Sequence, residues 1–223
     1  MSQFVVRGGK PLGGVIRPQG AKNEALQVIS AVLLTPDPIT MHNIPDILDV
    51  NLLVELLQEM GVKITRPSAG SITFQADAID MEYLESAAFH KKGGRLRGSV
   101  MLAGPMLGRF GKGFIPKPGG DKIGRRRLDT HIIGFEKLGA TFSYHADQGY
   151  YSLHGKNMKG AYMLMDEPSV TGTANLVMAA ALTPGTTTLY NAACEPYVQQ
   201  LCHMINRMGG RIQGIGSNLL IIE

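Results

Sequence analysis

The 223-residue sequence predicts a mixed α/β (α+β) fold made of three similar units. Its 44% hydrophobic and 18% charged residues are enough for a buried core and exclude a disordered chain or a coiled coil. Twenty-eight glycines and 12 prolines indicate many turns between short elements. The third observation is a phrase that occurs three times, as LLQEMGVKI at Leu56–Ile64, GFEKLGATF at Gly134–Phe142 and MINRMGGRI at Met204–Ile212.

The repeated phrase predicts the same local structure each time. A helix with periodic apolar residues ends at a Leu or Met, a glycine (Gly61, Gly139 or Gly209) takes a left-handed cap, and an alternating strand follows. The unit is roughly seventy residues long, whereas solenoid repeats span about 20–50 residues. We therefore expect threefold pseudosymmetry, with helices inside and sheets outside or the reverse.

The first and third units contain the same elements in the same order. In the first unit we expect a helix at Gly20–Thr35, a strand at Pro38–Ile44 and a helix at Asp46–Met60. In the third unit the corresponding elements are a helix at Ser169–Thr183, a strand at Thr186–Ala192 and a helix at Glu195–Met208. A proline-containing turn joins the first helix to the strand in both units.

The middle unit departs from this pattern. Its first helix is expected at Ser99–Gly111, and the simple strand connection is replaced by a loop rich in glycine and lysine at Lys112–Arg127. Binding residues concentrate on loops that a rigid scaffold holds, so this loop is where we expect function to lie.

The charge distribution points to the same segment. Lys91–Arg127 contains 11 Lys and Arg, one acidic residue and 10 of the 28 glycines, whereas the rest of the chain has more acidic than basic residues. A cationic, glycine-rich segment suits an anionic ligand. A nucleic-acid partner is not expected, because Phe110 and Phe114 are the segment's two stacking aromatics and no DNA- or RNA-binding motif is recognisable.

The cellular setting follows from what the sequence lacks. It has no 18-residue apolar run and no apolar signal-peptide region at its start, so we expect no membrane partner. Two cysteines, Cys194 and Cys202, are too few for a disulfide framework, and we expect them to serve packing. We expect a soluble, cytoplasmic protein with neither a metal site nor a cofactor.

Four motifs resemble those of the enolpyruvyl transferases: GAKNEAL at Gly20–Leu26, PGGDKIGRRRLDTHI at Pro118–Ile132, GFEKLGA at Gly134–Ala140 and NAACEP at Asn191–Pro196. The resemblance runs along the whole chain but covers about half of the family's length. It implies an inside-out α/β barrel with helices inside and sheets outside, which is the first of two domains with the active site between them.

The resemblance also implies domain boundaries. Residues 1–21 form a strand segment that packs with the second domain, and residues 22–223 form the first domain. Its three repeats are expected at about 22–90, 91–157 and 158–223. The second domain is absent from this chain.

The implied reaction is transfer of the enolpyruvyl group of phosphoenolpyruvate to the 3′-hydroxyl of UDP-N-acetylglucosamine, with release of phosphate. It is the first committed step of bacterial peptidoglycan synthesis. By the resemblance, Lys22, Asn23, Arg97 and Arg126 hold phosphoenolpyruvate and the reacting centre, and Lys22 also takes part in catalysis. Without the resemblance, Lys22 and Asn23 are equally well interpreted as a solvated lysine and a helix-capping asparagine.

Asp121 stands where most members of the family have a cysteine that acts as a general acid. The resemblance implies that Asp121 is the general acid here. An aspartate is ionised at pH 7 and its cationic neighbours lower its pKa further, so we expect protonation only in the closed ternary complex. Fosfomycin alkylates the cysteine thiolate in the family, so we expect insensitivity to it. The alternative interpretation is an aspartate that stabilises a turn.

The nucleotide side of the site is implied for two stretches. Arg127, Leu128, Asp129, Thr130 and His131 match residues that hold the uracil and ribose, with the histidine near a phosphate. Ser169, Val170 and Thr171 match a turn that holds the diphosphate at a helix N-terminus. Taken alone, His131 is expected on a helix surface. Glu167 departs from the lysine common in the family, and a carboxylate there is expected to repel the diphosphate.

Two alternatives remain open. One is the shikimate-pathway enolpyruvyl transferase, which shares fold and chemistry but usually begins its first helix with a Lys-Ser phrase. The other is a non-catalytic module that binds anionic nucleotides. Because the implied second domain supplies the general base and further arginines, we expect this chain alone to be inactive.

Overall fold

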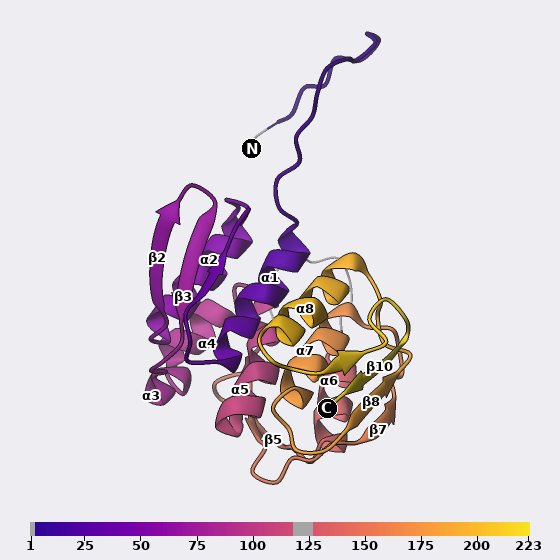
Figure 1. The fold of residues 1–223 in the computed structure, drawn as a ribbon. Helices are drawn as coiled ribbons and strands as arrows, with labels where there is room; N and C mark the ends of the chain where they lie inside the picture. Colours follow the sequence, from indigo (N-terminus) through magenta and orange to yellow (C-terminus); the bar gives the residue numbers. More distant parts are fainter. Residues whose placement is uncertain (1–2, 118–126) are drawn as a thin grey trace.

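The computed structural model describes residues 3–117 and 127–223. Three small sheets surround a group of central helices, with β2 and β3 on one side and β7, β8 and β10 on the other (Figure 1). The central helices contribute long buried stretches to a single hydrophobic core; they are α1 (Lys22–Ser30), α5 (Ala103–Phe110) and α7 (Val170–Ala180). The structure thus confirms the expected mixed α/β fold with helices inside and sheets outside.

The first segment forms one three-stranded antiparallel sheet in the order β1-β3-β2. Its elements are α1 (Lys22–Ser30), the 3₁₀ helix η1 (Ala31–Leu34), β1 (Ile39–Met41), α2 (Leu48–Glu59), β2 (Lys63–Ser68), β3 (Ser71–Gln75), α3 (Met81–Leu84) and α4 (Ala87–Gly93). The helix expected at Gly20–Thr35 is therefore α1 followed by a 3₁₀ turn.

The second segment forms the antiparallel sheet β4-β6-β5. Its elements are the 3₁₀ helix η2 (Arg97–Leu102), α5 (Ala103–Phe110), β4 (Lys112–Pro116), α6 (Asp129–Lys137), β5 (Thr141–His145) and β6 (Tyr150–His154). The loop expected from Lys112 onward is wrong for its first five residues, because Lys112–Pro116 is a strand. It was missed because β4 is stabilised by pairing with the distant β6, from Lys112 opposite His154 to Pro116 opposite Tyr150.

The third segment forms the sheet β7-β8-β10-β9, in which β7 runs parallel to β8. Its elements are β7 (Tyr162–Leu164), α7 (Val170–Ala180), β8 (Thr187–Tyr190), α8 (Pro196–Arg207), β9 (Ile212–Gln213) and β10 (Leu219–Ile222). The strand and the two helices expected in this segment are confirmed.

The three cap glycines have the conformation that the repeat predicts. Gly61, Gly139 and Gly209 have φ of +97°, +98° and +105°, a region that L-residues with a side chain rarely adopt. Each glycine directly follows a helix whose last turn it ends. The repeated phrase therefore marks the same helix-to-strand turn in all three segments.

Small side chains let the central helices approach closely. A Cβ atom at Gly104 of α5 would lie 2.3 Å from the carbonyl oxygen of Asn175 on α7. At Gly134 of α6 it would lie 2.5 Å from the Leu176 side chain. The close packing of α5, α6 and α7 depends on these glycines and brings polar groups of the three helices within hydrogen-bonding distance.

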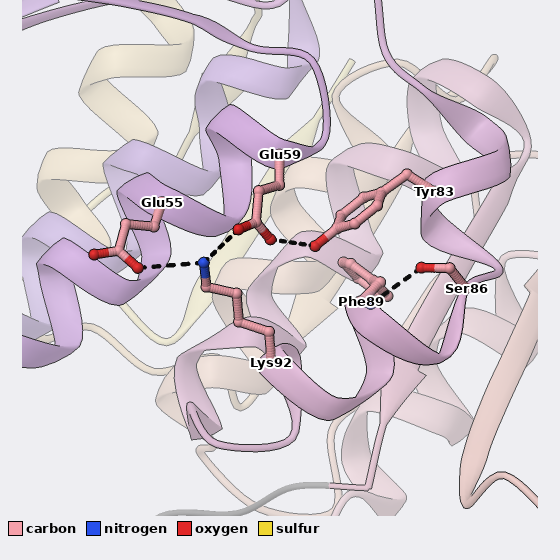
Figure 2. Close-up of polar contacts among 6 residues, drawn as sticks. All are labelled: Glu55, Glu59, Tyr83, Ser86, Phe89 and Lys92. Atoms are coloured by element: carbon pink, nitrogen blue, oxygen red, sulfur yellow. Dashed lines mark hydrogen bonds and ion pairs between the residues drawn. The ribbon is translucent and has the colours of Figure 1, made fainter.

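A polar cluster fastens α4 to α2 (Figure 2). Lys92 Nζ lies 2.6 Å from Glu59 Oε1 and 3.2 Å from Glu55 Oε2, and the Tyr83 hydroxyl donates to Glu59. These contacts lower the pKa of Glu59 and raise that of Lys92, because the paired charges favour each other's ionised form. The cluster holds the segment that leads directly into η2, which begins at Arg97.

The segment before α1 extends away from the domain (Figure 1). Residues 3–21 contain no strand, and the apolar side chains of Phe4, Val6, Leu12 and Ile16 are at least nine-tenths exposed. An apolar segment of this kind fits the expectation that it packs against another part of a longer protein, which stays a prediction.

Candidate active site

The candidate residues that the structure describes lie at the starts of four helices. Lys22 and Asn23 open α1, Arg97 opens η2, residues 127–131 lead into α6, and Ser169 caps α7. A helix N-terminus carries unpaired N–H groups and a partial positive charge, so each start favours an anion. The packing of the helices decides which of these N-termini lie close together.

The starts of α6, α7 and η2 meet at His131. Its Nε2 lies 3.1 Å from Thr171 Oγ1, and its Nδ1 lies 2.9 Å from Asn175 Nδ2. Arg97 is close enough to lower the pKa of His131, in addition to the larger effect of burial. The structure therefore brings Arg97, His131 and Thr171 into one cluster, while the roles expected for them in substrate binding stay predictions.

The expectation that His131, taken alone, lies on a helix surface is wrong. The residue is 2% exposed, because α6 packs against α7 on that face. Burial and the Arg97 charge lower the pKa of His131 to about 4, so the ring is neutral at physiological pH. A neutral imidazole here acts as a hydrogen-bond donor and acceptor, not as a cation.

Ser169 caps the N-terminus of α7. The Ser169 hydroxyl accepts a hydrogen bond from Gly172 N at 3.2 Å, and the Ser169 carbonyl accepts from Thr173 N at 2.8 Å. Val170 and Thr171 occupy the first turn, where N–H groups have no partner within the helix. Their side chains are half-buried, so this turn is accessible from solvent.

The start of α6 carries charges of both signs. Arg127 forms an ion pair with Asp129, with Nε 2.6 Å from Oδ2. The hydroxyl of Thr130 lies 2.9 Å from an Asp166 oxygen and 3.4 Å from a Glu167 oxygen. The Glu167 carboxylate thus faces Thr130, and it also helps to raise the pKa of Arg127. Leu128, between Arg127 and Asp129, is half-buried and packs against the core.

The start of α1 adjoins η2. Lys22 Nζ lies 2.5 Å from Asp49 Oδ2 at the start of α2. Leu26, one turn below Lys22 on the same face, packs on Gly98 next to Arg97. Asn23 is exposed and does not cap α1, since the cap residue is Ala21 and no side chain bonds the first turn. The interpretation of Asn23 as a cap is therefore wrong.

Asp121 and Arg126 lie outside the described residues. Their roles as general acid and phosphoenolpyruvate ligand stay predictions. Within residues 3–117 and 127–223, no group of three or more His, Cys, Asp and Glu side chains is placed to hold a metal ion. No helix in the same residues is long and apolar enough to span a membrane.

Three residues that contact candidate residues were missed by the sequence analysis: Asn175, Asp49 and Asp166. Asn175 could have been found, because it follows Thr171 by one helical turn and so shares its face. Asp49 and Asp166 reach their partners through contacts between distant segments, for which the sequence shows no local signal.

A pocket of about 580 Å³ lies beside α1. It is bordered by the β1 strand, the following turn to Pro45, and the face of α8 that carries Met204 and Arg207. It adjoins Ala21 and Glu24, and none of the candidate residues within 3–117 and 127–223 lines it.

The fold and the cluster define a class of protein: a threefold α/β scaffold in which the starts of three helices meet in one polar cluster. Comparison with known proteins identifies the family. The family model of EPSP synthase (3-phosphoshikimate 1-carboxyvinyltransferase) matches residues 6–223. The chain therefore belongs to the enolpyruvyl transferase family.

Two curated relatives carry the same name. The chain is 60% identical over all its 223 residues to a UDP-N-acetylglucosamine 1-carboxyvinyltransferase of Bacteroides thetaiotaomicron and 58% identical to one of Porphyromonas gingivalis. It spans 51% of each, so about half the length of these curated relatives.

Solved structures support the fold. The enolpyruvyl transferase NikO from Streptomyces tendae superposes with a TM-score of 0.80 at 23% identity, over 96% of this chain and 49% of that one. EPSP synthase from Acinetobacter baumannii superposes with a TM-score of 0.67 at 16% identity, over 92% of this chain and 46% of that one.

Proposed function

We propose that this chain is the N-terminal domain of an enzyme that transfers the enolpyruvyl group of phosphoenolpyruvate to the 3′-hydroxyl of UDP-N-acetylglucosamine. The observation that carries the proposal is the cluster of Arg97, His131 and Thr171 at three helix starts, in a chain 60% identical to relatives with that name. The enzyme would act in the bacterial cytoplasm in peptidoglycan synthesis, and so in cell division.

The reaction joins two anionic substrates. The sugar hydroxyl adds to C2 of phosphoenolpyruvate while a proton is delivered to the methylene carbon, which gives a tetrahedral intermediate. Loss of a proton from the new methyl group and departure of phosphate then restore the double bond. Cations and helix N-termini are suited to both anions, because they favour charge that is already present and charge that develops on phosphate.

The phosphoenolpyruvate side is assigned to Lys22, Asn23, Arg97 and Arg126, with Asp121 as the general acid. The guanidinium of Arg97 is suited to bidentate binding of a carboxylate or phosphate. Lys22 would exchange its Asp49 partner for substrate, an inexpensive change, since exposed ion pairs contribute about 0–1 kcal/mol. This gives Lys22 a role in binding as well as in catalysis.

The nucleotide side is assigned to the starts of α6 and α7. Residues Arg127 to Thr130 would line the uridine, and Ser169, Val170 and Thr171 would hold the diphosphate through the first-turn N–H groups. Glu167 opposes this assignment, because its carboxylate faces the Thr130 hydroxyl and the Arg127 charge is already paired with Asp129.

A second domain would complete the site. The general base and further arginines would come from it, and residues 1–21 would pack with it through their exposed apolar side chains. We therefore expect no turnover from the 223-residue chain alone.

The test is release of inorganic phosphate from phosphoenolpyruvate, measured with UDP-N-acetylglucosamine as acceptor. We expect turnover from a protein that carries both domains and none from the present chain. Turnover with 3-phosphoshikimate in its place would favour the shikimate-pathway enzyme. Nucleotide binding without turnover by the two-domain protein would favour the non-catalytic module.

A further inference from the structure

A chain of hydrogen bonds begins at Asn175, which is fully buried on α7. Its side-chain oxygen accepts from Gly104 N at 2.8 Å, and its Nδ2 donates to the Val100 carbonyl at 2.8 Å. A backbone N–H can only donate and a carbonyl can only accept, so these partners determine which end of the amide is nitrogen. The second hydrogen of Nδ2 is left for His131 Nδ1, 2.9 Å away.

The asparagine therefore selects one form of the imidazole. Since Nδ2 supplies the hydrogen, His131 Nδ1 must accept it, and the neutral ring carries its own hydrogen on Nε2. That hydrogen points to Thr171 Oγ1, 3.1 Å from Nε2. The charged group that faces His131 from another element is Arg97 on η2, while Asp166 and Glu167 contact the preceding residue on α6.

The direction of these hydrogen bonds decides whether the Thr171 hydroxyl can donate its hydrogen to a ligand. Its hydroxyl accepts from His131, so its own hydrogen is directed elsewhere. In the described part of the structure, Thr171 Oγ1 makes no other hydrogen bond than the one to His131. The hydroxyl hydrogen thus joins the first-turn N–H groups of Val170 and Thr171 as a third donor at the same half-buried turn.

Three donors at one turn that have no acceptor among the described residues suit an oxygen that carries negative charge. Resting on the proposed function, we propose that Asn175 is a positioning residue that acts through His131 to present the Thr171 hydroxyl as a hydrogen-bond donor to a diphosphate oxygen of the nucleotide sugar. The inference assigns Asn175 a role and gives the Thr171 side chain, beyond its backbone, a part in selecting the ligand.

The first experiment reads the hydrogen-bond chain without any ligand. Nitrogen-15 NMR of the imidazole distinguishes the two neutral tautomers, and we expect His131 to carry its hydrogen on Nε2 at pH 7. A ring protonated on Nδ1 would overturn the inference, because Thr171 would then have to donate to His131 and could not donate outward.

The second experiment measures the affinity of the two-domain protein for UDP-N-acetylglucosamine by calorimetry. Thr171→Val keeps the shape of the side chain and removes the hydroxyl, and we expect affinity to fall by about 10-fold or more, as for a hydrogen bond to a charged group. Thr171→Ser should retain affinity within about threefold. The control is Thr173→Val on the same helix, whose buried hydroxyl accepts from Ala193 N at 2.9 Å and should not affect affinity.

The third experiment tests whether Asn175 acts through Thr171. In Asn175→Asp the carboxylate keeps a hydrogen on His131 Nδ1, so Nε2 loses its hydrogen at high pH and accepts one from Thr171. We expect affinity near that of the unmodified protein at low pH and about 10-fold weaker at high pH, whereas the unmodified protein shows no such step. Adding Thr171→Val should remove the pH dependence.

The outcomes separate this inference from the function it rests on. If the unmodified two-domain protein does not bind the nucleotide sugar, both are overturned. If it binds but Thr171→Val binds equally well, or if Asn175→Asp weakens binding by the same factor at every pH, the inference alone is overturned. The Thr171 variants remain informative even where Asn175→Asp does not fold, because Thr171 is half-buried and its replacements keep its size.

Discussion

Replacing Gly104 by alanine should separate the two central helices and destabilise the domain. A Cβ atom there would lie 2.3 Å from the Asn175 carbonyl oxygen and 2.8 Å from its side-chain oxygen. An ordinary contact of this kind needs more than 3 Å, so α5 and α7 must move apart by about 1 Å. The carbonyl belongs to a buried helix, so it cannot rotate out of the way.

The magnitude follows from three effects. Alanine is intrinsically better than glycine in a helix by about 1 kcal/mol. Overpacking a well-packed core costs about 1–3 kcal/mol, and loss of the hydrogen bond from Gly104 N to Asn175 leaves buried polar groups unpaired at a cost of about 1–3 kcal/mol. We expect Gly104→Ala to lower the free energy of unfolding by about 1–5 kcal/mol in total.

Urea unfolding, followed by circular dichroism, measures this change. The midpoint should fall while the slope stays the same, which indicates lower stability and an unchanged unfolding transition. Gly98→Ala is the matched control, since its Cβ would meet the end of the flexible Leu26 side chain at 3.1 Å, and we expect a change within about 1 kcal/mol. Equal or higher stability of Gly104→Ala would refute the argument that backbone contact holds α5 to α7.

Three further predictions concern pH, capping and an inhibitor. Burial lowers the pKa of His90 and His131 to about 4, so the unfolded chain takes up protons first as the pH falls. The stability present above pH 6.5 should decrease by about 3 kcal/mol per residue between pH 6.5 and 4, and urea unfolding curves with the same midpoint at pH 7 and pH 4.5 would contradict this. Ser169→Ala removes the α7 cap and should lower the free energy of unfolding by about 1 kcal/mol in thermal melts, whereas Ser169→Asp should retain it. The two-domain enzyme should resist fosfomycin and Asp121→Cys should make it sensitive, because a carboxylate is a weak nucleophile toward an epoxide; time-dependent inactivation of the unmodified enzyme with a mass increase on Asp121 would disprove it.

Local patterns predicted much of the fold. The helix and strand order of the first and third segments followed from apolar periodicity, because these elements alternate with strong turn signals such as Pro36 and Pro184. Strand β4 did not, because a five-residue strand is recognised by the partner that it pairs with, and its partner β6 is distant in sequence. The helices predicted from local periodicity were therefore easier to find than the strands.

The candidate site, like the fold, was predicted from the sequence only in part. Motif resemblance identified Arg97, His131 and Thr171, and the structure places them in one cluster. The resemblance did not predict that His131 is buried and neutral, or that Asn175 forms a hydrogen bond with it. Both properties depend on how α6 packs against α7. Asp121 and Arg126, outside the described residues, are supported by the motif alone.

The sequence by itself determined the family, the three-unit repeat and the cap glycines, since each is written in residue types at short spacing. Gly61 needs a positive φ whatever surrounds it, and that requirement is visible in the chain. Only the tertiary structure decided the charge state of His131, the direction of its hydrogen bonds and the partner of Lys22. These properties depend on desolvation and on distances between segments far apart in the chain, which arise only when the helices pack together.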